Sequence, residues 1–131
     1  MASASTEPRR GEVWLAALGA ARPGELGKNR PAIVVSADFV SVGTIADLIA
    51  VVPLSSSRTP SVLRPEVTDV EGVDRPSRAI CQSIRGVGRS RLLRRLGMLT
   101  PATLAEVERA LALTLGLDDH QAKSGISTQS K

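Results

Sequence analysis

The sequence predicts an α+β domain, a small and strongly curved antiparallel β-barrel with a C-terminal helix and a short basic helix. Two patterns support this fold class. Five short apolar segments recur at regular spacing between turn-forming residues, whereas the last long apolar segment has helical rather than alternating periodicity. With 131 residues, of which 42% are hydrophobic, the chain has the size of one compact domain.

The predicted strands are rich in β-branched residues and end at glycine, proline or clustered polar residues. They cover residues 11–18, 30–36, 47–54, 62–67 and 78–84. The second is apolar on both faces, which indicates a central strand, and Pro65 places the fourth at an edge. Pro31 cannot donate to a strand ladder, so it belongs at the first residue of its strand, and Arg30 must be extended because it precedes a proline. We therefore expect Arg30 at a loop-to-strand junction.

Two helices are expected towards the C-terminus. The arginine-rich segment 89–97 is interpreted as the short basic helix, ended by Gly97. The second helix has clear boundaries, because Thr100 suits the N-cap, Pro101 the first helical position and Gly116 the residue after the end. Its apolar residues step by three or four and form one stripe for packing on the sheet. They are Leu104, Val107, Leu111 and Leu115.

The ends of the chain carry little that could be buried. We expect a disordered leader over residues 1–8, the barrel domain over 9–117 and a flexible tail over 118–131. No apolar run approaches the roughly 20 residues of a membrane helix, and the N-terminus lacks the apolar core of a secretory signal. A cytoplasmic protein without membrane attachment is expected.

Cys81 is the only cysteine, which excludes an internal disulfide and a zinc site built on paired cysteines. A buried structural thiol is favoured over a reactive one, because free cysteine is among the most buried residue types. Trp14 is expected in the core, whereas Phe39 lies in a predicted loop and its role stays open.

The formal charge of +4 is unevenly distributed, and 14 of the 17 cations are arginines. Between Pro76 and Ala105 the chain has no acidic residue but six arginines. The guanidinium group matches phosphate oxygens with two parallel hydrogen bonds, so this stretch suits nucleic acid or an acidic peptide. A solvated basic face without a ligand is the alternative.

Several kinds of catalysis are excluded by the residues present. The only histidine, His120, lies in the predicted tail, which excludes a Ser/His/Asp triad and a pair of catalytic histidines in the domain. No segment presents acids or histidines at metal-ligand spacing, and no glycine motif for phosphate precedes a helix, so no metal or cofactor is expected.

A carboxylate and an arginine remain available for catalysis. Cleavage of RNA by its own 2′-hydroxyl needs a base for that proton and positive charge on the crowded phosphorus. Glu25 and Arg30 lie in one loop and its strand junction and can supply both. Such a pair can equally be solvated, or paired internally, without any catalytic role.

Four segments occur in an order and spacing that resemble the MazF/PemK family of toxin-type endoribonucleases. They are "RRGEVWLAAL", "GELGKNRPAIVVS", "IAVVPLSSS" and "CQSIRGVGRSRLLRRLGMLTPATLAEVERALALTLGL". The resemblance spans about residues 9–117 and is strongest to arginine-rich actinobacterial members. It implies a barrel like that of the gyrase poison CcdB, a homodimer, and a cognate acidic antitoxin similar to MazE as partner. It also implies metal-independent, sequence-specific cleavage of single-stranded RNA to 2′,3′-cyclic phosphate and 5′-hydroxyl ends.

The resemblance also implies roles for individual residues. Glu25 would be the base, Arg30 the stabiliser of negative charge and Ser55 a phosphate ligand. Gln82 stands where several relatives have an acidic residue, and a glutamine cannot act as a base. Further contacts to RNA are expected from Lys28, Ser56, Arg58, Gln82, Ser83 and Arg85.

Two other functions fit the same fold. One is a toxin that docks to gyrase as CcdB does, without chemistry, and the other is a non-catalytic RNA-binding module. Glu25 and Arg30 favour the enzyme, because a docking protein has no need of a carboxylate beside an arginine.

Overall fold

The computed structural model of the chain describes residues 7–19, 28–41 and 48–117. The predicted base Glu25, residues 1–6 of the predicted leader and the whole predicted tail with His120 lie outside the described residues, as does the side chain of Phe39. Glu7 and Pro8, the last residues of the predicted leader, are described: Pro8 is fully buried and Glu7 forms an ion pair with Arg89. No helix in the described ranges is long and apolar enough to cross a membrane.

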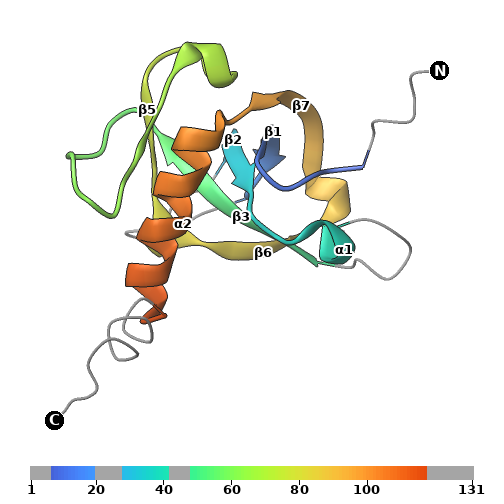
Figure 1. Cartoon of the computed structure of the whole chain (residues 1–131). Helices are drawn as coiled ribbons and strands as arrows, with labels where there is room; N and C mark the ends of the chain where they lie inside the picture. The colour runs from blue at the N-terminus through green and yellow to red at the C-terminus, as the bar shows by residue number, and fades with distance from the viewer. Residues whose placement is uncertain (1–6, 20–27, 42–47, 118–131) are drawn as a thin grey trace, which may run out of the picture.

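Seven antiparallel strands form one curled sheet. Helix α2 (Pro101–Leu115) packs against this sheet, as Figure 1 shows. The strand order is β4-β5-β3-β2-β1-β7, and β6 also pairs with β3. The strands are β1 (Glu12–Ala17), β2 (Asn29–Val34), β3 (Leu48–Ser55), β4 (Glu66–Val67), β5 (Ser77–Ala79), β6 (Arg85–Gly88) and β7 (Leu92–Met98). A four-residue helix, α1 (Asp38–Ser41), follows β2. This curled antiparallel half-barrel with a C-terminal helix confirms the predicted α+β class.

Strand β3 is the centre of the sheet because it pairs with three other strands. Its first half pairs with β6, its middle with β2 and its last two residues with β5. The prediction that the second strand is central is confirmed, since β2 lies between β1 and β3. Pro31 occupies the third residue of β2 rather than the first, because the ladder with β1 continues to Asn29, opposite Ala17.

The predicted fifth strand, 78–84, is wrong beyond Ala79. The chain leaves β5 through a single 3₁₀ turn, η3 (Cys81–Ser83), before it enters β6. The two short strands pair with different parts of β3, so the chain must change direction between them. The predicted fourth strand is reduced to β4, which lies at the edge of the sheet as Pro65 indicated.

The predicted short basic helix over 89–97 is also wrong. Only Arg89–Arg91 form one 3₁₀ turn, η4, and the remainder is strand β7, paired with β1. Pairing across the sheet overrides helix propensity here. An ion pair supports the pairing: Arg95 Nε donates to Glu12 Oε2 at 2.9 Å, and this arginine is partly exposed whereas the glutamate is buried.

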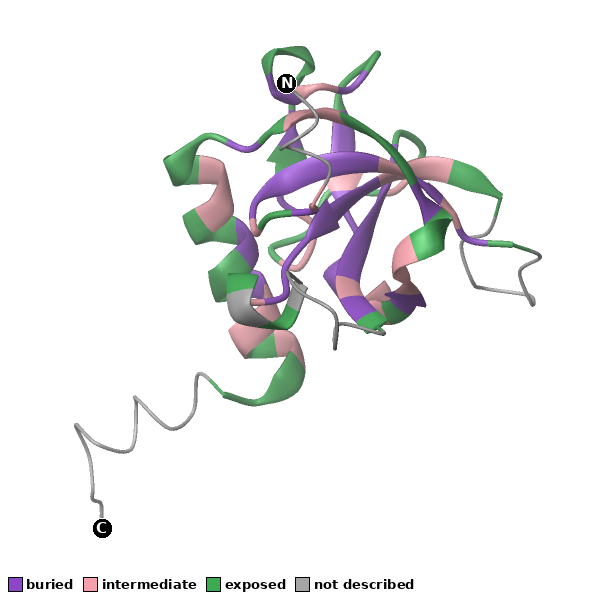
Figure 2. Ribbon diagram, turned by 90° about the vertical axis from the view of Figure 1, so that its right-hand side faces the viewer, coloured by how far each residue is buried: buried purple, intermediate pink, exposed green. Residues whose placement is uncertain are grey.

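Helix α2 has the predicted boundaries. The Thr100 hydroxyl accepts a hydrogen bond from the Thr103 amide at 3.2 Å, Pro101 is the first helical residue, and Gly116 takes the left-handed conformation with φ of 77°. Figure 2 shows the buried side of the helix facing the sheet. Val107 and Ala110 are buried there, but Leu115, the last residue of the predicted stripe, is 53% exposed.

The apolar residues form two clusters on opposite faces of the curled sheet. One includes Ile33 of β2 and Val107 of α2, and the other includes Trp14 together with Ala32 and Val34. Neighbouring residues of β2 therefore enter different clusters, which explains why this strand is apolar on both faces. Trp14 is 6% exposed, so its predicted place in the core is confirmed.

A buried carboxylate joins the segment before β5 to the start of α2. Glu71 ends the 3₁₀ turn η2 (Asp69–Glu71) and is 2% exposed. One carboxylate oxygen accepts from the Thr68 amide at 3.0 Å, and the other accepts from the Thr100 amide at 2.9 Å. Burial raises the pKa of Glu71, but hydrogen bonds from Thr68, Thr100 and Thr103 together hold the net pKa below its ordinary value.

We expect Glu71→Gln to lower the free energy of unfolding at pH 7 by about 3 kcal/mol, because charge-assisted hydrogen bonds are lost and an amide NH₂ faces donors. The lowered pKa means that the stabilisation is complete above about pH 4.3, the ordinary glutamate value, and is lost as the pH falls through the folded value. Urea unfolding at several pH values should show that the difference in free energy of unfolding between wild type and variant becomes smaller in acid. A difference in unfolding free energy that does not change with pH would contradict this account. The control is Glu106→Gln, a substitution of an exposed glutamate on α2.

Candidate functional site

Arg30 is the second residue of β2, directly after the β1–β2 loop, and it lies opposite Ala16 of β1. Its predicted place at a loop-to-strand junction is confirmed. The half-buried side chain reaches the end of β3, where Nη1 donates to the Leu54 carbonyl at 3.2 Å. The guanidinium is thereby held beside the residue that follows Leu54, which is Ser55.

Ser55 is the last residue of β3 and lies opposite Arg78 of β5. It is 5% exposed, and its hydroxyl accepts a hydrogen bond from the Ser57 amide at 3.3 Å. Arg30 and Ser55 share the wall of a hollow of about 170 Å³. Since a water molecule occupies about 30 Å³ of the liquid, this hollow has room for a phosphate group. It is lined by Arg30, Pro31, Leu54, Ser55, Ser56, Val73, Asp74, Arg75 and Ser77.

Of the predicted site residues, the structure brings Arg30, Ser55 and Ser56 together at one hollow. Lys28 is exposed and does not line the hollow. It has a positive φ of 64°, and its amide donates to the Gly19 carbonyl at 2.6 Å, which closes the base of the loop that carries Glu25. Because Glu25 lies outside the described residues, its approach to Arg30 stays a prediction.

The other predicted RNA contacts lie elsewhere. Arg58 follows the end of β3, Gln82 and Ser83 belong to η3, and Arg85 begins β6 opposite Val51. None of these four residues lines the hollow with Arg30. Their contacts to RNA remain predictions for a surface beyond it.

One wall of the hollow was not predicted from the sequence. Val73, Asp74 and Arg75 belong to the segment between η2 and β5, which has the composition of an ordinary turn, and Ser77 is the first residue of β5. Asp74 and Arg75 are exposed, whereas Ser77 is buried and its hydroxyl donates to the Arg75 carbonyl at 2.9 Å. Only the pairing of β5 with the end of β3 brings this segment to Ser55, and no local pattern reveals that pairing.

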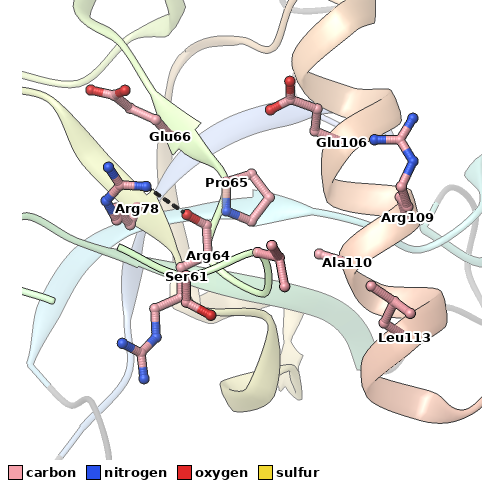
Figure 3. A pocket seen from close by; sticks show the side chains of 10 residues that line it. Ser61, Arg64, Pro65, Glu66, Arg78, Glu106, Arg109, Ala110 and Leu113 are labelled. Atoms are coloured by element: carbon pink, nitrogen blue, oxygen red, sulfur yellow. Dashed lines mark hydrogen bonds between the residues drawn. The ribbon is translucent and has the colours of Figure 1, made fainter. Parts of the chain in front are cut away.

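A larger hollow of about 530 Å³ lies between α2 and the segment that leads into β4, and Figure 3 shows its lining. Arg78 Nη1 donates there to the Arg64 carbonyl at 3.0 Å, and Arg109 and Leu113 approach from α2. Arg30 and Ser55, the predicted catalytic residues that the structure describes, do not line it. Two adjacent residues of β5 therefore line different hollows: Ser77 lines the smaller one and Arg78 lines the larger one.

No three histidine, cysteine, aspartate or glutamate side chains gather as metal ligands would within residues 7–19, 28–41 and 48–117. Among the described residues that line the smaller hollow, Asp74 is the one with a carboxylate. The site that the structure describes therefore consists of two arginines, an aspartate and several hydroxyls. This set can bind a phosphate and stabilise added negative charge on it.

Cys81 takes no part in this site. It is fully buried in the cluster beneath α2, and burial raises the pKa of its thiol to about 11. The thiolate is therefore scarce at neutral pH. We expect the native protein to resist alkylation by iodoacetamide at pH 8, and the protein unfolded in guanidinium chloride to take up one adduct, as mass spectrometry would show. Rapid labelling of the native chain would contradict the structural role.

Comparisons with known proteins find relatives of one family. The family described as PemK-like, MazF-like toxin of type II toxin-antitoxin system matches residues 9–115. "Endoribonuclease MazF9" of Mycobacterium tuberculosis is 36% identical over 116 residues, which cover 83% of this chain and 97% of the relative. The crystal structure of MazF from Deinococcus radiodurans superposes with a TM-score of 0.71 at 27% identity, covering 84% of this chain and 97% of the other.

A further similar structure is titled as an endoribonuclease in complex with its cognate antitoxin from Mycobacterial species. It has a TM-score of 0.69 and 25% identity, and it covers 84% of this chain and 96% of the other. The matched residues include both strands that bring Arg30 and Ser55 together. The chain therefore belongs to the PemK-like, MazF-like toxin family of type II toxin-antitoxin systems.

Proposed function

We propose that this toxin is a sequence-specific, metal-independent endoribonuclease that cuts single-stranded RNA in the cytoplasm. The observation that carries the proposal is the shared hollow of Arg30 and Ser55, which are far apart in the sequence and come from different strands. Relatives named endoribonucleases support the activity. An arginine and a hydroxyl in one phosphate-sized hollow suit the non-bridging oxygens of a phosphodiester.

The proposed reaction uses the RNA's own 2′-hydroxyl as nucleophile. A carboxylate takes the proton of this hydroxyl, the 2′-oxygen bonds to phosphorus, and the bond to the 5′-oxygen breaks. The departing oxygen takes up a proton and becomes a 5′-hydroxyl, while the other product keeps a 2′,3′-cyclic phosphate. Arg30 stabilises the extra charge on the phosphorane, and Ser55 donates a hydrogen bond to one of its oxygens.

Incubation of a long RNA with the purified protein in EDTA tests the proposal. We expect discrete fragments whose 5′ ends are phosphorylated by polynucleotide kinase without prior phosphatase treatment, since they carry free hydroxyls. Salt-sensitive binding of RNA without fragments would instead indicate an RNA-binding module. Neither binding nor cleavage would favour a docking toxin of the gyrase-binding kind.

The proposed base is Glu25, and Asp74 is the carboxylate that the structure places at the hollow. A comparison of Glu25→Gln with Asp74→Asn under saturating RNA determines which of the two carboxylates acts as the base. We expect Glu25→Gln to lower kcat by about a hundredfold or more and Asp74→Asn to leave kcat within a few-fold of wild type. The opposite pattern would assign the base to Asp74.

We also propose a homodimer and an acidic antitoxin as partner, because a similar endoribonuclease was solved with its cognate antitoxin. The basic stretch exposes Arg91, Arg94 and Arg95, which suits an acidic segment. Leu93 and Met98 of β7 are also exposed, at 49% and 47%, and such apolar side chains favour association. Light scattering of the purified chain, with and without the product of an adjacent gene, measures both assemblies.

A further inference from the structure

We infer that Arg75 is a second phosphate-binding arginine of the site, holding the RNA backbone in the hollow that it shares with Arg30 and Ser55. The inference rests on the proposed function, because it takes RNA as the substrate. It assigns a substrate contact to a segment, residues 73–77, in which the sequence analysis placed none. The first observation is the position of Arg75 itself, which lines the same hollow as Arg30.

The side chain of Arg75 is available for a ligand. It is exposed, and no hydrogen bond or ion pair joins its guanidinium to another residue in the part of the chain that the structure describes. Several other arginines are engaged by the protein, for example Arg95 with Glu12 and Arg78 with the Arg64 carbonyl. A guanidinium at the wall of a phosphate-sized hollow and without a protein acceptor is suited to bind an anion.

The backbone that carries Arg75 is held on both sides. Before it, Glu71 is fixed to Thr100, and Gly72 adopts φ of 114° against β7, where a Cβ atom would lie 2.8 Å from the Leu96 carbonyl oxygen. After it, the buried Ser77 hydroxyl donates to the Arg75 carbonyl at 2.9 Å. A fixed backbone reduces the entropy that is lost when the arginine binds its ligand.

The charge of the hollow also fits one phosphodiester. Arg30 and Arg75 contribute two positive charges and Asp74 one negative charge, so the described lining has a formal charge of +1. A phosphodiester has a charge of −1, and the phosphorane of the reaction has one more. Two guanidiniums that line one hollow can each donate to a different non-bridging oxygen. With Arg30 alone, the described lining would have no net charge.

The test measures binding and cleavage separately. Binding uses a single-stranded RNA with one 2′-deoxy nucleotide at the position that wild type cuts, titrated at several KCl concentrations. We expect Arg75→Ala to raise Kd about tenfold to a hundredfold and to lower the slope of log Kd against log salt by about 0.7. Arg75→Lys should keep the slope, because the charge remains, while it binds more weakly than wild type, because the two-pronged contact is lost.

The matched control is Arg109→Ala, an exposed arginine on α2 at the larger hollow, which should leave Kd and slope unchanged. Melting curves establish that each variant is folded. If folded Arg75→Ala has an unchanged Kd and slope while the wild type cuts RNA, the inference about Arg75 is overturned and the proposed function stands. A wild type that binds but does not cut would overturn the proposed function, while a reduced slope in Arg75→Ala would still support the phosphate contact.

Discussion

Arg30→Ala is expected to lower the rate of RNA cleavage by about a thousandfold while the protein remains folded. The guanidinium donates to the Leu54 carbonyl and lines the hollow beside Ser55, where the proposed mechanism places the charge of the phosphorane. Alanine removes this charge and leaves the backbone of β2 unchanged. Because the side chain is only half-buried, little packing is lost.

The measurement is single-turnover cleavage of a fluorescent RNA, with circular dichroism as the check of folding. Arg30→Lys separates charge from geometry, since lysine keeps the charge but not the planar fork, and it should recover only part of the rate. Arg109→Ala on α2 serves as the matched arginine control. Full activity in folded Arg30→Ala would remove Arg30 from the catalytic role.

Gly97→Ala is expected to prevent stable folding. A Cβ atom at Gly97 of β7 would lie 2.4 Å from the Glu71 carbonyl oxygen and 2.8 Å from the Gly72 Cα, and both are backbone atoms that cannot rotate away. Relieving the clash requires the segment that carries Glu71 to leave β7, which breaks the bonds of Glu71 to Thr100. Disruption on this scale typically costs more than about 4 kcal/mol, a large share of the stability of a small domain.

Gly86→Ala on β6 is the matched control, since its Cβ would meet only the Leu48 side chain at an ordinary 3.7 Å. We expect the control to unfold in urea near the wild-type midpoint and Gly97→Ala to show no cooperative transition. A Gly97→Ala protein that melts within a few degrees of wild type would contradict the close packing of the two segments.

The parts of the fold that the sequence predicted are those with strong local signals. The run of apolar residues after Pro31 identified the central strand β2, and the Thr100, Pro101 and Gly116 signals identified α2. Strand β7 was missed because arginines and leucines favour a helix locally, and only its pairing with β1 decides otherwise. The turn η3 was missed because residues 78–84 alternate like one strand, although they connect two.

In the site, too, residues with a local sequence signal were predicted and residues placed by long-range pairing were not. Arg30 was identified from its position before Pro31 and from the family resemblance, and Ser55 from the resemblance alone. The wall formed by Asp74 and Arg75 was not predicted, because its place follows from the pairing of β5 with Ser55 and Leu54 of β3. Long-range pairing of this kind leaves no periodic signal in the sequence.

The central claim is that the RNA supplies its own nucleophile in the hollow shared by Arg30 and Ser55. The most direct measurement uses two RNAs that are identical except for one 2′-deoxy nucleotide on the 5′ side of the cleaved bond. We predict that wild-type protein binds both RNAs with similar affinity, cuts the all-ribose RNA to a 2′,3′-cyclic phosphate and leaves the substituted RNA intact. Cleavage of the substituted RNA at the same bond would contradict the account.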